Sequence, residues 1–107
     1  MFALPPFSNP KTHSMSIQDI IHQPNTRIID VREPFEFEEE HIAGALNIPL
    51  NQIPAHAEEI RKFHSPVVLY CRSGNRSAQA CEIMGEEGFE NVKNLSGGIM
   101  RWPFDTV

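Results

Sequence analysis

The sequence predicts a single α/β domain, with a mostly parallel central sheet and helices on both of its faces. Short β-rich runs alternate with amphipathic, helix-like segments along the chain, which is typical of parallel sheets. One run, residues 67–71, is apolar throughout, as expected of a strand that is buried on both faces. The length of 107 residues allows one hydrophobic core and leaves no room for a second.

The first 14 residues are expected to form an irregular arm, because they hold three of the nine prolines and show no sustained periodicity. The folded domain is then expected to span residues 15–107. Its first helix should begin at Ser16, whose side chain can cap free amides, with Asp19 in the favourable first turn. Pro24 should end this helix.

The middle of the chain predicts two further strands and two further helices. Residues 27–32 form a β-rich run, and residues 34–40 suit a short helix with proline in its first turn. Residues 43–49 are typical of a turn followed by a short strand. Residues 51–63 carry apolar side chains at helical spacing, and Pro66 should stop that helix.

The run at residues 67–71 is the strongest strand in the chain and is expected at the centre of the sheet. Ser77 is a candidate N-cap for a helix that continues through Glu87, with Gly88 placed to end it. Residues 92–95 predict a last strand. A glycine pair and a terminal turn follow, in which Trp102 is expected to cover the core.

Composition limits the partners that this chain can bind. A net charge of −5 argues against nucleic acid and against anionic membrane surfaces, so any anion site must be local. Two cysteines do not make a disulfide scaffold, and a reactive thiol survives best in a reducing compartment, so we expect a cytoplasmic location. The apolar first seven residues lack a basic start and contain prolines, unlike a signal peptide.

Cys71 is the candidate nucleophile. It follows a predicted parallel strand, and open parallel sheets bind ligands beyond the carboxyl ends of their strands. The next residues form a polar loop in which Gly74 and Asn75 tolerate left-handed backbone angles. Their amides can form an anion-binding nest, completed by the start of the next helix. Beside such amides and the cations Arg72 and Arg76, the pKa of a thiol falls from about 8.5 to roughly 3.5–7.5, which predicts a reactive, partly exposed thiolate.

Four motifs, in this order along the chain, resemble those of rhodanese-type sulfurtransferases. They are Ile-Asp-Val-Arg-Glu-Pro at 29–34, His-Ile-Ala-Gly-Ala-Leu-Asn-Ile-Pro at 41–49, Cys-Arg-Ser-Gly-Asn-Arg-Ser at 71–77, and Asn-Leu-Ser-Gly-Gly-Ile-Met-Arg-Trp at 94–102. The resemblance covers roughly residues 16–103. Two positions depart from the pattern, since Glu40 and Ala43 stand where many relatives have glycine and proline, and the turn there is expected to differ locally.

The resemblance implies a single rhodanese domain that needs no cofactor and no metal. Cys71 would take a sulfane sulfur from thiosulfate or a related persulfide donor and hold it as a persulfide. A thiophilic acceptor, cyanide or a cellular thiol, would then remove it. By similarity, the substrate-binding residues are those of the loop after the nucleophile, in which the two arginines hold the anionic donor: Arg72, Ser73, Gly74, Asn75, Arg76 and Ser77.

Three alternative functions use the same features. The persulfide could be relayed to a protein acceptor rather than to a small molecule. A phosphatase or arsenate reductase of the cell-cycle phosphatase type uses a similar loop, but four residues separate Cys71 from Arg76, one fewer than is typical there, and the tighter pocket suits sulfur better. Rhodanese-like domains that serve only as interaction modules have lost the cysteine, whereas Cys71 is present.

Several other side chains have plain structural interpretations. Cys81 is expected to pack in the core rather than to act as a resolving thiol. Asp30 and Arg32 are expected to form an internal ion pair, and His41 a structural hydrogen bond at a turn. The five histidines show no metal-ligand pairing. An acidic stretch is expected to be a solvated helix face, and it comprises Glu36, Glu38, Glu39 and Glu40.

Overall fold

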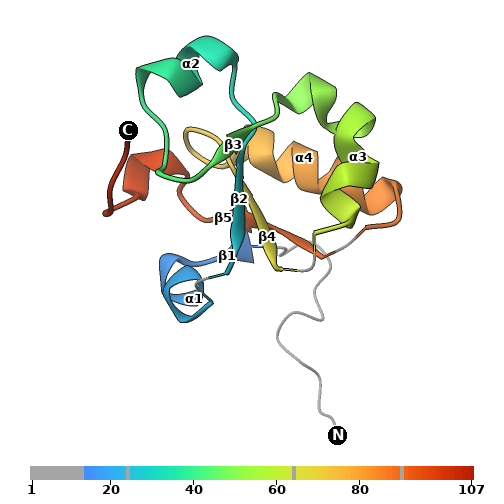
Figure 1. Cartoon of the computed structure of the whole chain (residues 1–107), viewed down its shortest axis with the longest axis horizontal. Helices are drawn as coiled ribbons and strands as arrows, with labels where there is room; N and C mark the ends of the chain where they lie inside the picture. Colours follow the sequence, from blue (N-terminus) through green and yellow to red (C-terminus); the bar gives the residue numbers. More distant parts are fainter. Residues whose placement is uncertain (1–13, 24, 64, 90) are drawn as a thin grey trace, which may run out of the picture.

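The computed structural model describes residues 14–23, 25–63, 65–89 and 91–107, so most of the expected N-terminal arm lies outside the described residues. The fold is an α/β domain built on a five-stranded sheet in the order β1-β5-β4-β2-β3 (Figure 1). Every pair of neighbouring strands is parallel. The strands are β1 (Ser14–Met15), β2 (Arg27–Asp30), β3 (Leu46–Asn47), β4 (Val67–Tyr70) and β5 (Val92–Leu95).

Four α-helices and two 3₁₀ turns complete the described fold. The helices α3 and α4 lie together on one side of the sheet, and α1 lies on the other side (Figure 1). The predicted placement of helices on both faces is therefore confirmed. The elements are α1 (Ile17–His22), α2 (Pro34–Glu39), α3 (Ile53–Arg61), α4 (Asn75–Glu86), η2 (Leu50–Gln52) and η3 (Ile99–Arg101).

The central strand β4 divides the core into two clusters, because successive side chains of a strand point to opposite faces. Val67 and Leu69 pack with side chains of α3 and α4, whereas Val68 and Tyr70 pack with residues of α1 and the C-terminal segment. All four side chains are fully buried. Burying an aliphatic or aromatic side chain stabilises a fold by about 1.5–3 kcal/mol, so β4 fixes both layers around itself.

Local signals explain where several helices begin and end. The expected cap is confirmed, since the Ser16 hydroxyl accepts from the amide of Asp19. The Asp19 carboxylate also accepts from the amide of Ser16, which completes a capping box. The helix α2 begins with Pro34, as expected. Gly88 follows α4 with a φ of +89°, the left-handed conformation that ends many helices.

Two expectations at element ends need correction. Ser14, the last residue of the expected arm, belongs to β1, where it pairs with Asn94 of β5. This strand was not predicted, because two residues are too few to show a periodicity. Ser77 is not the N-cap of α4, because the helix begins at Asn75 and its N-cap is Gly74. A φ of +118° at Gly74 turns the chain into the helix early and places Ser77 inside the first turn.

No helix in the described part of the chain is both long and apolar enough to cross a lipid bilayer.

Candidate active site

Cys71 follows β4 directly, at the carboxyl end of the central strand, which is where the sequence predicts it. Its expected partial exposure is wrong, because the residue is only 1% exposed and packs with the core cluster between the sheet and α3 and α4. The sulfur nevertheless has polar partners. The amide of Gly74 donates to Sγ over 3.1 Å, and Ser77 Oγ lies 3.4 Å from Sγ.

These polar partners favour the thiolate. Burial raises the pKa of Cys71, but the Ser77 hydroxyl and the amides of Ser77, Gly74 and Ser73 together hold the pKa below its ordinary value. Of the predicted nest, the Gly74 amide donates to the sulfur directly, and the hydroxyl of Ser77, which sequence reasoning assigned to helix capping, lies beside it. The arrangement can stabilise negative charge on a sulfur atom at this position.

We expect alkylation of Cys71 by iodoacetamide to reach half its maximal rate below the pH of about 8.5 that an ordinary thiol shows. The reason is that only the thiolate reacts, and the loop donors favour it. Peptide mass spectrometry after timed labelling would separate Cys71 from Cys81, whose pKa burial raises to about 12. A midpoint for Cys71 at or above that of a free thiol would contradict this prediction.

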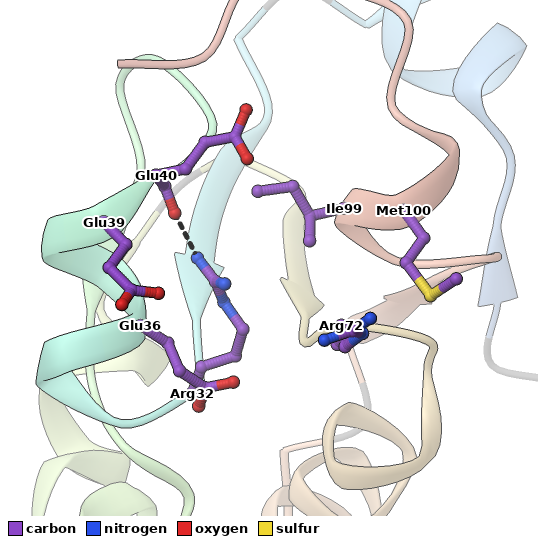
Figure 2. A pocket seen from close by; sticks show the side chains of 7 residues that line it. All are labelled: Arg32, Glu36, Glu39, Glu40, Arg72, Ile99 and Met100. Atoms are coloured by element: carbon purple, nitrogen blue, oxygen red, sulfur yellow. Dashed lines mark hydrogen bonds between the residues drawn. The ribbon is translucent and has the colours of Figure 1, made fainter.

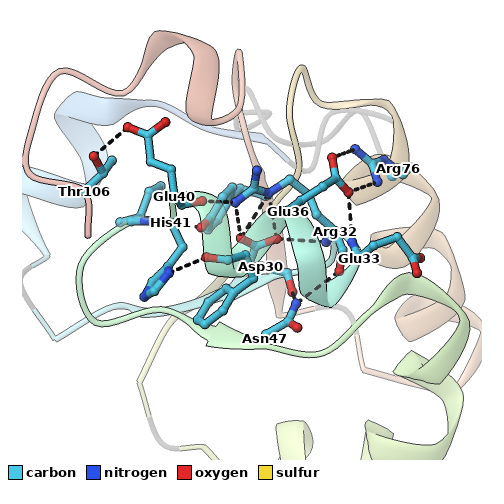
Figure 3. A network of polar contacts seen from close by, with 12 residues as sticks. Asp30, Arg32, Glu33, Glu36, Glu40, His41, Asn47, Arg76 and Thr106 are labelled. Atoms are coloured by element: carbon cyan, nitrogen blue, oxygen red, sulfur yellow. Dashed lines mark hydrogen bonds and ion pairs between the residues drawn. The ribbon is translucent and has the colours of Figure 1, made fainter.

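The two loop arginines have different surroundings. Arg76, in the first turn of α4, makes a two-point ion pair with Glu36 of α2, with Nη1–Oε1 and Nη2–Oε2 distances of 2.8 and 3.1 Å (Figure 3). Hydrogen bonds from Arg76 are the main cause that lowers the pKa of Glu36 to about 2. The acidic stretch was expected to be a solvated helix face, and this expectation is wrong for Glu36, which is partly buried against Arg76. Arg72 is exposed and lies beside Met100 (Figure 2).

A cavity of about 560 Å³ lies between α2 and η3, at the same edge of the sheet as Cys71. Figure 2 shows carboxylates of α2 on one side, the side chains of η3 on the other, and Arg32 between them. Cys71 is not among the lining residues, so the cavity adjoins the loop at Arg72 without reaching the sulfur. The lining residues are Arg32, Glu36, Glu39, Glu40, Arg72, Ile99 and Met100.

The predicted ion pair between Asp30 and Arg32 is confirmed, and it is buried. Arg32 Nη2 lies 2.8 Å from Asp30 Oδ2, and the Arg32 amide donates to Asp30 Oδ1 over 2.8 Å. The same guanidinium donates to the carbonyl of Glu40 over 2.6 Å (Figure 3). Because Glu40 follows the last turn of α2, this pair ties β2 to the helix that carries Glu36.

The turn after α2 is held by His41, in the structural role expected from the sequence. His41 Nδ1 lies 2.7 Å from the carbonyl of Phe37, one turn earlier, and its ring stacks on the Phe37 ring. At Glu40, where relatives have glycine, the backbone is extended, with a φ of −170° that any residue can adopt. The Glu40 carboxylate accepts from the hydroxyl of Thr106 over 2.7 Å. Glu40 is therefore accommodated without backbone strain, and a local difference of the turn at Glu40 and Ala43 stays a prediction.

Comparison with known proteins agrees with this geometry. The family model described as the rhodanese-like domain matches residues 15–103. The chain belongs to the rhodanese-like domain family.

Three similar proteins show how far the likeness extends. An uncharacterized Bacillus subtilis protein, YqhL, is 46% identical over 76 residues, which cover 71% of this chain and 60% of that protein. The thiosulfate sulfurtransferase PspE of Escherichia coli is 40% identical over 70 residues, which cover 64% and 67%. The crystal structure of a rhodanese-related protein from Thermoplasma volcanium superposes with a TM-score of 0.76 at 30% identity, covering 89% of this chain and 97% of that one. This chain thus spans less than two thirds of the length of YqhL and about two thirds of PspE.

Asn94 of β5 opens the fourth motif of the sequence, but sequence reasoning gave it no part in the site of this rhodanese-like domain. Its Nδ2 donates to the carbonyl of Gly74 over 3.1 Å, and its Oδ1 accepts from the Ser77 hydroxyl over 2.5 Å. The register places Asn94 beside Leu69, two residues before Cys71 on the neighbouring strand. A polar residue near the carboxyl end of a predicted strand was the signal that could have found it.

Cys81 and Trp102 follow their plain interpretations. Cys81 is buried in the core cluster against α3, and Trp102 packs on the opposite cluster. Ser73 on the loop and Asn75 at the start of α4 are both exposed. Among the described residues, no three His, Cys, Asp or Glu side chains gather as metal ligands, and the predictions for His13 and His64 lie outside those residues.

Proposed function

We propose that this domain is a sulfurtransferase that carries sulfur as a persulfide on Cys71, from thiosulfate or a related persulfide donor to cyanide or a thiol. The observation that carries the proposal is the sulfur at the end of β4, which the loop amide of Gly74 and the Ser77 hydroxyl favour as a thiolate. The name of the E. coli relative, a thiosulfate sulfurtransferase, supports the same reaction.

The reaction proceeds as two displacements at sulfur. The Cys71 thiolate attacks the outer sulfur of thiosulfate, the bond between the two sulfur atoms of the donor breaks, and sulfite leaves with the electron pair. The acceptor then attacks the outer sulfur of the Cys71 persulfide, and the thiolate returns with the electrons of the broken bond. A covalent intermediate replaces one difficult transfer by two easier ones, and the amide nest holds the negative charge present at each stage.

The loop must move for the donor to reach the sulfur, since Cys71 is 1% exposed. The movement would involve residues 72–74, between β4 and α4, of which Arg72 and Ser73 are exposed. Loops that open and close over an active site on the microsecond to millisecond timescale are common in enzymes.

Intact mass spectrometry after incubation with thiosulfate tests the proposed intermediate. We expect the chain to gain the mass of one sulfur atom, mapped to the peptide that contains Cys71, and to lose it on addition of cyanide. The free thiol of Cys81 lies in the same molecule and serves as an internal control, because it is buried and protonated. Absence of the added sulfur, or its location on Cys81, would contradict the proposal.

Arg72 and Arg76 are proposed to hold the anionic donor, and their different surroundings sharpen the prediction. We expect Arg72→Ala to raise the KM for thiosulfate by about tenfold, the loss of one charged contact worth about 1.4 kcal/mol. Arg76→Ala should also raise it, partly because Glu36 is left as an uncompensated negative charge.

Steady-state kinetics with thiosulfate and with a neutral persulfide donor would check this prediction. In a Glu36→Gln background the effect of Arg76→Ala should shrink, whereas that of Arg72→Ala should stay the same. Equal effects of either substitution on both donors would show that these arginines do not recognise the charge of the donor.

A further inference from the structure

The Ser77 hydroxyl has two neighbours and only one hydrogen to donate. Its Oγ lies 2.5 Å from Asn94 Oδ1 and 3.4 Å from Cys71 Sγ. The residue is buried, so no solvent molecule competes for the hydroxyl. The shorter distance places the hydrogen on the side of Asn94. Rotation about the Cβ–Oγ bond of Ser77 would turn this hydrogen toward the sulfur without moving Oγ.

The carbonyl of Gly74 fixes the direction of these hydrogen bonds. Asn94 Nδ2 lies 3.1 Å from that carbonyl and must donate to it, because two oxygen atoms at this distance would repel each other. The amide oxygen of Asn94 therefore faces Ser77 and can only accept. A thiol on Cys71 completes the chain by donating its own hydrogen to Ser77 Oγ.

We propose that Asn94 is a positioning residue. Its Oδ1 accepts the hydrogen bond of the Ser77 hydroxyl while Cys71 is protonated, and the hydroxyl donates to Cys71 Sγ instead when the sulfur is a thiolate. When a base from water or buffer removes the thiol proton, the Ser77 hydroxyl rotates to donate to Sγ, and Asn94 Oδ1 loses its partner. No bond between heavy atoms changes. This inference rests on the proposed role of Cys71 as the nucleophile.

The proposal predicts that the effect of Ser77 on the ionisation of Cys71 depends on whether Asn94 is present. In the wild type, the hydroxyl stabilises the thiolate only after giving up its bond to Asn94, so part of its effect on the sulfur is cancelled. Without the Asn94 oxygen, the hydroxyl would serve the sulfur alone. Ser77 should therefore matter more for the ionisation of Cys71 when Asn94 is absent. If Asn94 only anchored the loop through Gly74, its loss would loosen the contact between Ser77 Oγ and Cys71 Sγ. Ser77 would then have a smaller effect on the ionisation of Cys71.

A double-mutant cycle on the ionisation of Cys71 tests this dependence. The pH profile of Cys71 alkylation by iodoacetamide would be measured for wild type, Ser77→Ala, Asn94→Ala and the double variant, each rate normalised to its plateau at high pH. Below the midpoint, Ser77→Ala should slow alkylation at least about twofold more in the Asn94→Ala background than in the wild type, the lower end of couplings between contacting residues. An equal or smaller effect in that background would overturn the proposal.

A second variant keeps the test decisive if Asn94→Ala fails to fold, which thermal unfolding would reveal. Asn94→Asp retains an acceptor for the Ser77 hydroxyl and adds a negative charge, so it should move the alkylation midpoint of Cys71 to higher pH. An unchanged or lower midpoint would overturn the proposal. Asn91→Ala, which changes an exposed asparagine just before β5, is the matched control. In that background, the effect of Ser77→Ala on the alkylation of Cys71 should be the same as in the wild type.

The readout requires no sulfur donor, so it separates this inference from the proposed function. If Ser77→Ala has the larger effect expected in the Asn94→Ala background but no persulfide forms, sulfur transfer from thiosulfate is contradicted and the role of Asn94 is supported. If a persulfide forms but that effect is equal or smaller, sulfur transfer is supported and the role of Asn94 is contradicted.

Discussion

Replacing Cys71 by serine is expected to abolish sulfur transfer while leaving the fold intact. Serine has nearly the same volume and can accept the hydrogen bond that the Gly74 amide donates to Sγ, so the buried site keeps its packing. Its hydroxyl does not ionise near neutral pH and cannot hold a sulfane sulfur. We expect turnover of thiosulfate with cyanide to fall by at least about three orders of magnitude, the scale seen when a nucleophile is removed.

The other cysteine provides the matched control for this experiment. Cys81 lies on α4 in the core, and Cys81→Ala removes a buried thiol without touching the loop. That variant should keep full turnover per folded molecule and lose only a small part of its stability, which thermal unfolding would measure. Undiminished turnover in Cys71→Ser, or loss of turnover in Cys81→Ala, would refute the assignment of the nucleophile.

The parts of this fold that sequence predicts well are those set by local signals. The apolar run of β4 predicts its central place, because only a strand buried on both faces needs no polar side. The capping box of Ser16 and Asp19 likewise marks the start of α1 within four residues of chain. The place of Cys71 then follows from chain order alone, since it comes directly after β4.

Contacts between distant segments could not be predicted in the same way. Glu36 looks like any member of an acidic helix face until α2 is placed beside α4, where Arg76 lies forty residues further along the chain. Ser77 looks like a helix cap because the sequence does not show that the N-cap of α4 is Gly74, three residues earlier. Burial of Cys71 depends on how the loop closes over the strand end, which no local pattern encodes.

The same limit explains why the motif at residues 94–102 did not reveal the contacts of Asn94. Its chemistry depends on the register between β5 and β4, which brings it beside the strand that leads to Cys71. A sequence pattern places β5 in the sheet but does not say which strand it pairs with, or which of its side chains faces the loop. Polar residues inside predicted strands therefore need the topology before they can be assigned to a site.

Loss of the Asp30 carboxylate is expected to cause the largest loss of stability of any single substitution considered for this domain. Asp30 is fully buried and accepts from the side chain and the amide of Arg32, which is only 6% exposed. Asp30→Ala would leave that guanidinium buried without its counterion. Breaking a buried pair in this way costs about 3–5 kcal/mol, a large part of the roughly 5–15 kcal/mol by which domains are stable.

Urea unfolding at neutral pH would measure this loss, with Glu39→Ala as the matched control. Glu39 is an exposed carboxylate at the end of α2, and its removal should change the free energy of unfolding by less than about 0.5 kcal/mol. The double variant Asp30→Leu/Arg32→Met should recover most of the lost stability, because an apolar pair of similar volume leaves no charge without a partner. A loss of stability in Asp30→Ala no greater than that in Glu39→Ala would show that the pair does not stabilise the fold.

Arg32 also donates to the carbonyl of Glu40 at the end of α2. Displacement of Arg32 would therefore free the helix that positions Glu36 against Arg76. The buried pair at the end of β2 is thus expected to stabilise both the core and the outer wall of the proposed active site.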